Sequence, residues 1–322
     1  MKKLRSLFLL VSLLAAIDLH AQSYTVTDLG TLGGASATAN AINSSGIVVG
    51  SANTAGDTVD VATLFAPSGN VNPGSLGGTA SSATDINDNS VVVGKAQLAG
   101  AGGNYHATLF SGTGSGNTDL GTLGGSSSNA SSINNSNIVV GTADLSSSSS
   151  HAVQFSGTGS GNTDLGGLAG SFTAAFDINN SNVIVGNAQP STSSNRNHAA
   201  TFSGTGTGNT DLGTLGGDAS YLIHTNAAGV GVGASQIAPG NAYHAARYSG
   251  GWTDLGTLGG SGSYASSINA SGIIVGGSLF GTIGAGDFGS IAFVYRDGTM
   301  VGSQHAHSAD SGTHADLRER HQ

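Results

Sequence analysis

The sequence predicts an all-β protein that folds as a six-bladed β-propeller, built from four-stranded repeats of about 45 residues. A Leu-Gly-Gly motif, or Leu-Ala-Gly in one copy, occurs six times, and its leucines lie 43 to 47 residues apart. Short Val and Ile runs, such as 138–140, return with the same period. No window shows a sustained apolar period of 3.6 residues, so helices are not expected in the repeats. A β-solenoid is the alternative architecture.

The first 21 residues have the pattern of a secretory signal peptide. Lys2, Lys3 and Arg5 precede an apolar run at 7–16, and the small residue Ala21 follows. A run of this length is too short to anchor a helix across a bilayer. We therefore expect a signal peptide at 1–21 and a mature protein that is secreted, attached to the cell surface or located in the periplasm.

Each repeat can hold four short strands in a fixed order. In one copy the first strand, 130–134, consists of small residues, and the second, 138–143, is the most apolar. The third strand opens with His-Ala at 151–155, and the fourth contains Asn-Thr-Asp-Leu-Gly at 162–166. Small residues suit the crowded strand nearest a propeller axis, and continuous apolar runs suit strands that are buried on both faces.

An Asn that is followed seven residues later by Gly occurs in every copy. It begins the link between the first and second strands, where an Asn side chain can hydrogen-bond the backbone two residues further on. We expect a structural role for these asparagines, which are Asn43, Asn87, Asn134, Asn179, Asn226 and Asn269.

The two ends of the repeat region are permuted. The mature chain would start with a strand of the fourth type, Tyr24–Leu29, whereas the last copy stops after a strand of the third type, Ile291–Tyr295. Pairing these strands would close the ring and remove two sheet edges. The sequence thus predicts one repeat domain at 22–301, closed by its N-terminal strand. Residues 302–322 have almost no apolar content and are expected to form a disordered tail.

The charge distribution excludes several kinds of partner. Residues 22–301 contain fourteen Asp, no Glu and only four cations: Lys95, Arg196, Arg247 and Arg296. Nucleic acid or an anionic membrane surface would require a basic patch, which four scattered cations cannot form. No later apolar run is long enough to span a bilayer, and there is no Cys. We predict an acidic monomer with no nucleic-acid partner, no membrane insertion and no cofactor.

The order of motifs points to a family. His-Ala-x-x-Phe, Asp-Leu-Gly-Thr-Leu-Gly-Gly, a Ser/Ala-rich strand and Ile-Asn-x-x-x-x-Val-Val-Gly follow one another through residues 24–298. This order resembles the repeat of the bacterial HAF-repeat extracellular proteins. The resemblance implies a secreted or cell-surface repeat protein and brings no catalytic residues. Val61 and Ile291 replace the motif His in the first and last copies, so this His cannot be essential in every blade.

Two further polar positions recur once per repeat. A His opens the third strand at His106, His151, His198 and His244. An Asp precedes the Gly-rich turn at Asp28, Asp119, Asp164, Asp211 and Asp254, with Asn72 in the odd copy. A metal-binding ring would need ligands within about 2.0–2.3 Å of one ion, and equivalent positions on neighbouring blades are too far apart for that. We expect the Asp to accept hydrogen bonds from backbone N–H groups of the turn and the His to cap a loop.

The loops between the second and third strands vary most, and all should emerge on one rim. Tyr105, Tyr243 and Phe288 are the aromatic residues there. The sequence favours a binding or scaffold module without catalytic activity, for an extracellular glycan or protein, with sugar stacking on these rings. Two alternatives stay open. One is an extracellular propeller hydrolase acting on polysaccharide, which would need two carboxylates facing one bond. The other is a purely structural surface protein.

Overall fold

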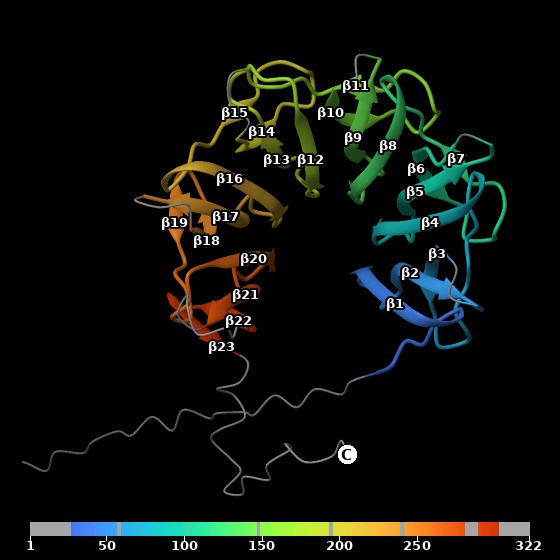
Figure 1. Ribbon diagram of the computed structural model, residues 1–322, viewed down its shortest axis with the longest axis horizontal. Coiled ribbons are helices and arrows are strands. Elements are labelled where there is room, and N and C mark those ends of the chain that lie inside the picture. The colour runs from blue at the N-terminus through green and yellow to red at the C-terminus, as the bar shows by residue number, and fades with distance from the viewer. Residues whose placement is uncertain are drawn as a thin grey trace, which may run out of the picture.

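The computed structural model describes residues 27–302 except 57–58, 101, 147–148, 193–195, 239–241 and 281–288. Six antiparallel sheets stand around a common axis as the blades of a propeller, and the described residues form no helix (Figure 1). The predicted six-bladed all-β propeller is therefore confirmed over the solenoid. The expected signal peptide at 1–21 and the expected tail at 302–322, apart from Gly302, lie outside the described residues. Gly302 is the last residue of a strand and not part of a tail.

The first three blades follow one another along the chain. Blade 1 contains β1 (Gly33–Ile42), β2 (Val48–Thr54) and β3 (Asp60–Phe65), and a single bridge between Leu64 and Val71 stands in place of a fourth strand. Blade 2 contains β4 (Gly77–Ile86), β5 (Val92–Leu98), β6 (Tyr105–Phe110) and β7 (Thr118–Asp119). Blade 3 contains β8 (Gly124–Ile133), β9 (Val139–Leu145), β10 (Ser150–Phe155) and β11 (Thr163–Asp164).

The other three blades repeat the same meander. Blade 4 contains β12 (Thr173–Ile178), β13 (Ile184–Ala188), β14 (His198–Phe202) and β15 (Thr210–Asp211). Blade 5 contains β16 (Gly216–Thr225), β17 (Gly231–Ile237), β18 (Tyr243–Tyr248) and β19 (Trp252–Asp254). Blade 6 contains β20 (Ser263–Ile268), β21 (Ile274–Phe280), β22 (Gly289–Arg296) and β23 (Thr299–Gly302).

The core consists of apolar layers between neighbouring blades rather than one central cluster. Between blades 3 and 4, for example, Val140 and Ala152 of blade 3 pack with Ile178, Ile184 and Phe202 of blade 4. Burying side chains on both faces of a sheet explains why the second strand reads as a continuous apolar run.

The turn asparagines link neighbouring blades by hydrogen bonds. Asn134 Oδ1 accepts the N–H groups of Ser136 and Ile138 in its own turn, whereas Asn134 Nδ2 donates to the carbonyl of Asn179 in the next blade, at 3.3 Å. The equivalent side chains of Asn43, Asn87, Asn179 and Asn226 make the same donation to the following blade. One side chain therefore both shapes a turn and fixes the neighbouring blade.

A hydroxyl on the first strand makes a second link between blades. Ser128 of blade 3 accepts the backbone N–H of Ala107 in blade 2 at 2.8 Å and donates to the carbonyl of Gly121 at 2.6 Å. Blades 2, 4, 5 and 6 use Ser81, Thr173, Ser220 and Ser263 in the same way. Blade 1 has Ala37 at this position, which cannot form the link.

The predicted closure by the N-terminal strand is wrong for the residues that the structure describes. Residues 27–29 are not in a strand, and the open edge of β22 is paired with β23 of its own blade. Asp297 and Gly298 both have positive φ, 52° and 77°, and form a two-residue hairpin turn that returns the chain to β22. Blade 6 therefore contains its own fourth strand, β23, which was not predicted from the sequence.

The first and last blades do not pack as other neighbours do. Ile42 on β1 is 65% exposed, whereas its equivalent Ile133 is 5% exposed. Val275 on β21 is 41% exposed, whereas its equivalent Val140 is fully buried. Within the described residues the ring is thus open between blades 1 and 6, which face one another across the gap (Figure 1).

Candidate functional site

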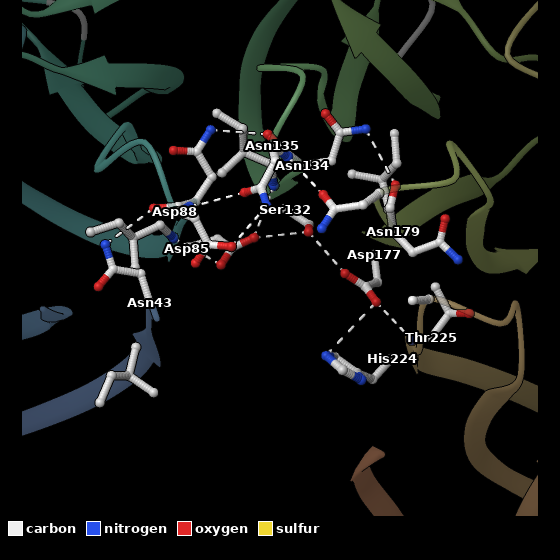
Figure 2. A pocket seen from close by; sticks show the side chains of 17 residues that line it. Asn43, Asp85, Asp88, Ser132, Asn134, Asn135, Asp177, Asn179, His224 and Thr225 are labelled. Atoms are coloured by element: carbon white, nitrogen blue, oxygen red, sulfur yellow. Dashed lines mark hydrogen bonds and ion pairs between the residues drawn. The ribbon is translucent and has the colours of Figure 1, made fainter. Parts of the chain in front are cut away.

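A cavity of about 230 Å³ lies where the first strands of blades 1 to 5 converge (Figure 2). It is lined by the ends of these strands and by the turns that follow them. None of the described residues that line it is a Lys or an Arg, whereas three are Asp. The cavity therefore combines carboxylates, amides and hydroxyls near the propeller axis.

One position of the repeat supplies most of the chemistry in this axial pocket. It is the residue directly before the Ile or Thr that ends the first strand, and it follows a register shift in that strand. Around the ring it is occupied by Ala41, Asp85, Ser132, Asp177, His224 and Ser267. Bulges next to binding sites re-aim side chains, and here the shift accompanies four polar side chains that line the pocket.

Ser132 connects two of these carboxylates. Its Oγ lies 2.9 Å from Asp85 Oδ2 and 2.8 Å from Asp177 Oδ1, as Figure 2 shows. Asp85 Oδ2 also accepts the N–H of Ile133 at 2.9 Å, and Asp177 Oδ2 accepts the N–H of Thr225 at 2.7 Å. Both carboxylates thereby bond to the next blade and stand on either side of one hydroxyl.

His224 continues the row from blade 5. Its Nε2 lies 4.0 Å from Asp177 Oδ2, and its Nδ1 is buried without a hydrogen-bond partner among the described residues. The side chain of His224 is 39% exposed, so one end of the row reaches solvent. The order across four blades is Asp85, Ser132, Asp177 and His224.

The two acidic positions on blade 2 differ in environment. Burial raises the pKa of Asp85, and the nearby charge of Asp177 adds to this shift. The hydrogen bonds that Asp85 accepts, including the one from the N–H of Ile133, oppose it. The pKa of Asp88, at the exposed mouth, is lowered by hydrogen bonds from Ser44 and Asn135. The environment thus shifts the pKa values of two carboxyl groups, three residues apart in sequence, in opposite directions.

A second polar ring forms the mouth of the pocket. Ser44 donates its N–H to Asp88 Oδ1, and Asp88 donates its N–H to Asn135 Oδ1, both at 2.9 Å. Asn135 in turn donates its N–H to Asn180 Oδ1 at 2.8 Å. Asn135 Nδ2 also returns a bond to Asp88 Oδ2. Hydrogen bonds between consecutive blades therefore link the turns of blades 1 to 4 at the mouth.

The recurring His and Asp positions come together in pairs rather than in rings. His106, His151, His198 and His244 each place Nδ1 within 3.0 Å of the carboxylate of Asp119, Asp164, Asp211 and Asp254, respectively. Each Asp also accepts the N–H of the Gly two residues later, as Asp28 does with Gly30. No cluster of three or more His, Cys, Asp or Glu in the described part of the chain could hold a metal ion.

The rim aromatics lie in separate places. The ring of Tyr105 on blade 2 lies 5.2 Å from Lys95 Nζ. The ring of Tyr243 on blade 5 lies 5.7 Å from that of Tyr221. Burial raises the pKa of Tyr221, and the nearby Tyr243 and Tyr264 add to the shift. Phe288, the third predicted rim residue, lies outside the described residues.

The axial pocket was not predicted from the sequence, because its polar residues are not among those that recur. The signal is a position that varies between the copies. The residue before Ile-Asn or Thr-Asn changes from Ala to Asp, Ser or His, while its neighbours repeat. A varying polar residue inside a constant frame is the pattern of a site built on a scaffold.

Comparison with known proteins gives no assignment for this site, since no protein-family model and no curated protein matches the chain. Among the described residues, no helix has the length and apolar character needed to cross a membrane.

Proposed function

We propose that the protein is an extracellular binding module whose axial pocket receives a small polyhydroxylated ligand, such as the end of a glycan chain. The observation that supports this is the position occupied by Asp85, Ser132, Asp177 and His224, which varies in chemistry while the rest of the repeat is constant. Carboxylate and amide groups without a neighbouring cation are suited to hydroxyl donors and poorly suited to anionic ligands.

Secretion is part of this proposal and is supported by the basic flank, apolar run and small residue of the first 21 residues. The resemblance to the HAF-repeat extracellular proteins supports the same location. Mass spectrometry of the secreted protein tests it, with Gln22 as the expected first residue. A chain that stays in the cytoplasm with residues 1–21 attached would contradict it.

Ligand binding is tested with a glycan array, followed by calorimetry on the glycans retained. We expect Asp177→Asn and His224→Ala to weaken binding at least tenfold. Asp60→Asn is the matched control, because it removes the same charge from an exposed residue that does not line the pocket. An equal loss in the control would indicate a general effect of charge. Retained affinity in both pocket variants would contradict binding at the axis.

The rim of blades 5 and 6 offers a second contact surface for a glycan. Tyr221 and Tyr243 form a tilted aromatic pair, and Tyr264 is 45% exposed. Sugar rings stack on such faces through their apolar C–H groups. Unchanged binding on the array after Tyr243→Ala would rule out this surface, and Tyr105→Ala tests the rim of blade 2 in the same way.

A hydrolase acting on polysaccharide is the second candidate function. The observation that favours it is that two carboxylates in one cavity, those of Asp85 and Asp177, lie within hydrogen-bond distance of the same hydroxyl. Release of new reducing ends from polysaccharides retained on the array, lost in Asp85→Asn and Asp177→Asn, would establish it. Binding without release supports the binding module. A protein that neither binds nor cleaves any of them would favour a purely structural role.

A further inference from the structure

The contacts of Ser132 constrain the protonation of the axial pocket. A serine hydroxyl has one proton to donate and lone pairs with which to accept. Ser132 Oγ lies at hydrogen-bond distance from an oxygen of each carboxylate, 2.9 Å from Asp85 and 2.8 Å from Asp177. If both carboxylates were charged, one contact would place two oxygen atoms together without a proton between them. A proton on one of the two carboxyl groups would allow both contacts to be hydrogen bonds.

The surroundings distinguish the two carboxyl groups. Asp177 Oδ2 accepts the N–H of Thr225 and lies 4.0 Å from His224 Nε2. Asp85 accepts the N–H groups of Ile86 and Ile133, whereas the basic group that lines the pocket lies beside Asp177. Asp85 lies on the first strand of blade 2, where burial raises the pKa of its carboxyl above the ordinary value. The other titratable groups that line the pocket are Asp88 and His224, and no described cation there stabilises a charge on Asp85.

We propose that Asp85 is a neutral carboxylic acid near neutral pH and donates its proton to Ser132 Oγ, while the Ser132 hydroxyl donates to a charged Asp177. This proposal rests on the proposed function only in taking the axial pocket as the ligand-binding site. It adds that the pocket contains a proton donor and a proton acceptor joined by a hydroxyl. Two carboxyl groups that environment holds in different protonation states are the arrangement that acid–base chemistry on a bound ligand uses.

Ser132 is a positioning residue in this arrangement. Ser132 is buried, at 4% exposure, and its hydroxyl lies between the two carboxyl groups. The proton donor and the acceptor come from blades 2 and 4, and the link comes from blade 3 between them. The arrangement therefore depends on three consecutive blades being in their observed register.

Infrared spectroscopy and carboxyl-carbon NMR test the proposal without any ligand. The wild-type protein near neutral pH should show one protonated carboxylic acid, and Asp85→Asn should lose its signal. Asp60→Asn is the control and should retain the signal. In an aspartate-labelled wild-type protein, the carboxyl resonance assigned to Asp85 should titrate well above the others, which decides the question even if Asp85→Asn fails to fold.

Two results would overturn the proposal. One is a wild-type protein in which every aspartate is charged near neutral pH. The other is a protonated signal that persists in Asp85→Asn and disappears in Asp177→Asn, which would reverse the assignment. Because these measurements need no ligand, a neutral Asp85 in a protein that binds no glycan would contradict the proposed function alone.

Discussion

His151 Nδ1 lies 2.9 Å from both carboxylate oxygens of Asp164, thirteen residues further along on the neighbouring strand of the same blade. Two polar series that look separate in the sequence are thus one repeated pair, which joins the third strand to the fourth. Asp164 Oδ1 also accepts the N–H of Gly166 at 2.7 Å. The pair fixes the outer edge of a blade and the turn that leads to the next one.

The first prediction concerns this pair. Asp164→Ala should cost about 1–2 kcal/mol of the free energy of unfolding, because it removes both the His contact and the turn bond. His151→Ala should cost less, because Gly166 keeps its acceptor. The side chain of Asp164 is 39% exposed, so solvent weakens the pair, and the coupling energy of a double-mutant cycle should be about 0.5 kcal/mol. A coupling near zero would show that the contact does not stabilise the blade.

The second prediction compares two turn asparagines. Asn134→Ala should cost about 2–4 kcal/mol in urea unfolding, because this buried side chain bonds its own turn and the carbonyl of Asn179. Asn269→Ala should cost about 1 kcal/mol, since among the described residues its exposed side chain bonds only the N–H of Ile273. Equal losses would mean that the bond between blades contributes nothing.

The repeat frame could be predicted from the sequence because backbone geometry dictates it. The apolar run at 138–140 indicates a strand that is buried on both faces, and Asn134 indicates a turn. Both patterns return in the other copies of the repeat. The closure could not be predicted in the same way. Asp297-Gly298 is a hairpin signal, yet it follows the last recognisable strand, at 291–295, and no copy of the fourth-strand motif comes after it.

The site could be predicted only in part. Tyr105 and Tyr243 were predicted on the rim from their place in variable loops, but the sequence does not show how far apart two blades stand. Asp85 and Asp177 are separated by two repeats, and only the ring geometry places them on the same hydroxyl. Single polar residues within a repeated strand carry no periodic signal, which is why the row across blades 2 to 5 was missed.

The third prediction uses the opening in the ring. Ile133→Ala should cost about 3 kcal/mol, because the side chain is buried between blades 2 and 3. The equivalent Ile42→Ala should change the free energy of unfolding by less than about 0.5 kcal/mol, because its side chain is already largely exposed. Urea denaturation of both variants measures the difference. A large loss for Ile42→Ala would show that the gap between blades 1 and 6 is closed in solution.

The fourth prediction explains the Gly that follows each turn Asn by seven residues. A Cβ at Gly141 would lie 2.0 Å from the carbonyl oxygen of Asn129 on the neighbouring strand, which no side chain can occupy. Gly141→Ala should therefore cost about 3 kcal/mol or more. Gly251→Ala is the control, because a Cβ there meets no atom within 4 Å and its φ is not positive. Similar stability of the two variants would contradict the close approach.

The fifth prediction is a pair of opposite pH dependences. The folded state raises the pKa of Asp85, so the stability that this carboxyl contributes is present below 3.8 and is lost as pH rises through its folded pKa. Relative to Asp85→Asn, the wild-type protein should thus lose stability as pH rises. Asp88 has a lowered pKa, so its contribution is present above 3.8 and is lost as pH falls through its folded pKa.

Relative to Asp88→Asn, the wild-type protein should therefore gain stability over the same rise in pH. Urea unfolding of the three proteins at several acidic pH values measures both differences. The comparison is informative because Asp85 and Asp88 lie on one blade and the two substitutions make the same chemical change. Slopes of the same sign would mean that burial of Asp85 does not outweigh the hydrogen bonds from Ser132, Ile133 and its own strand, and that its carboxyl is charged like that of Asp88.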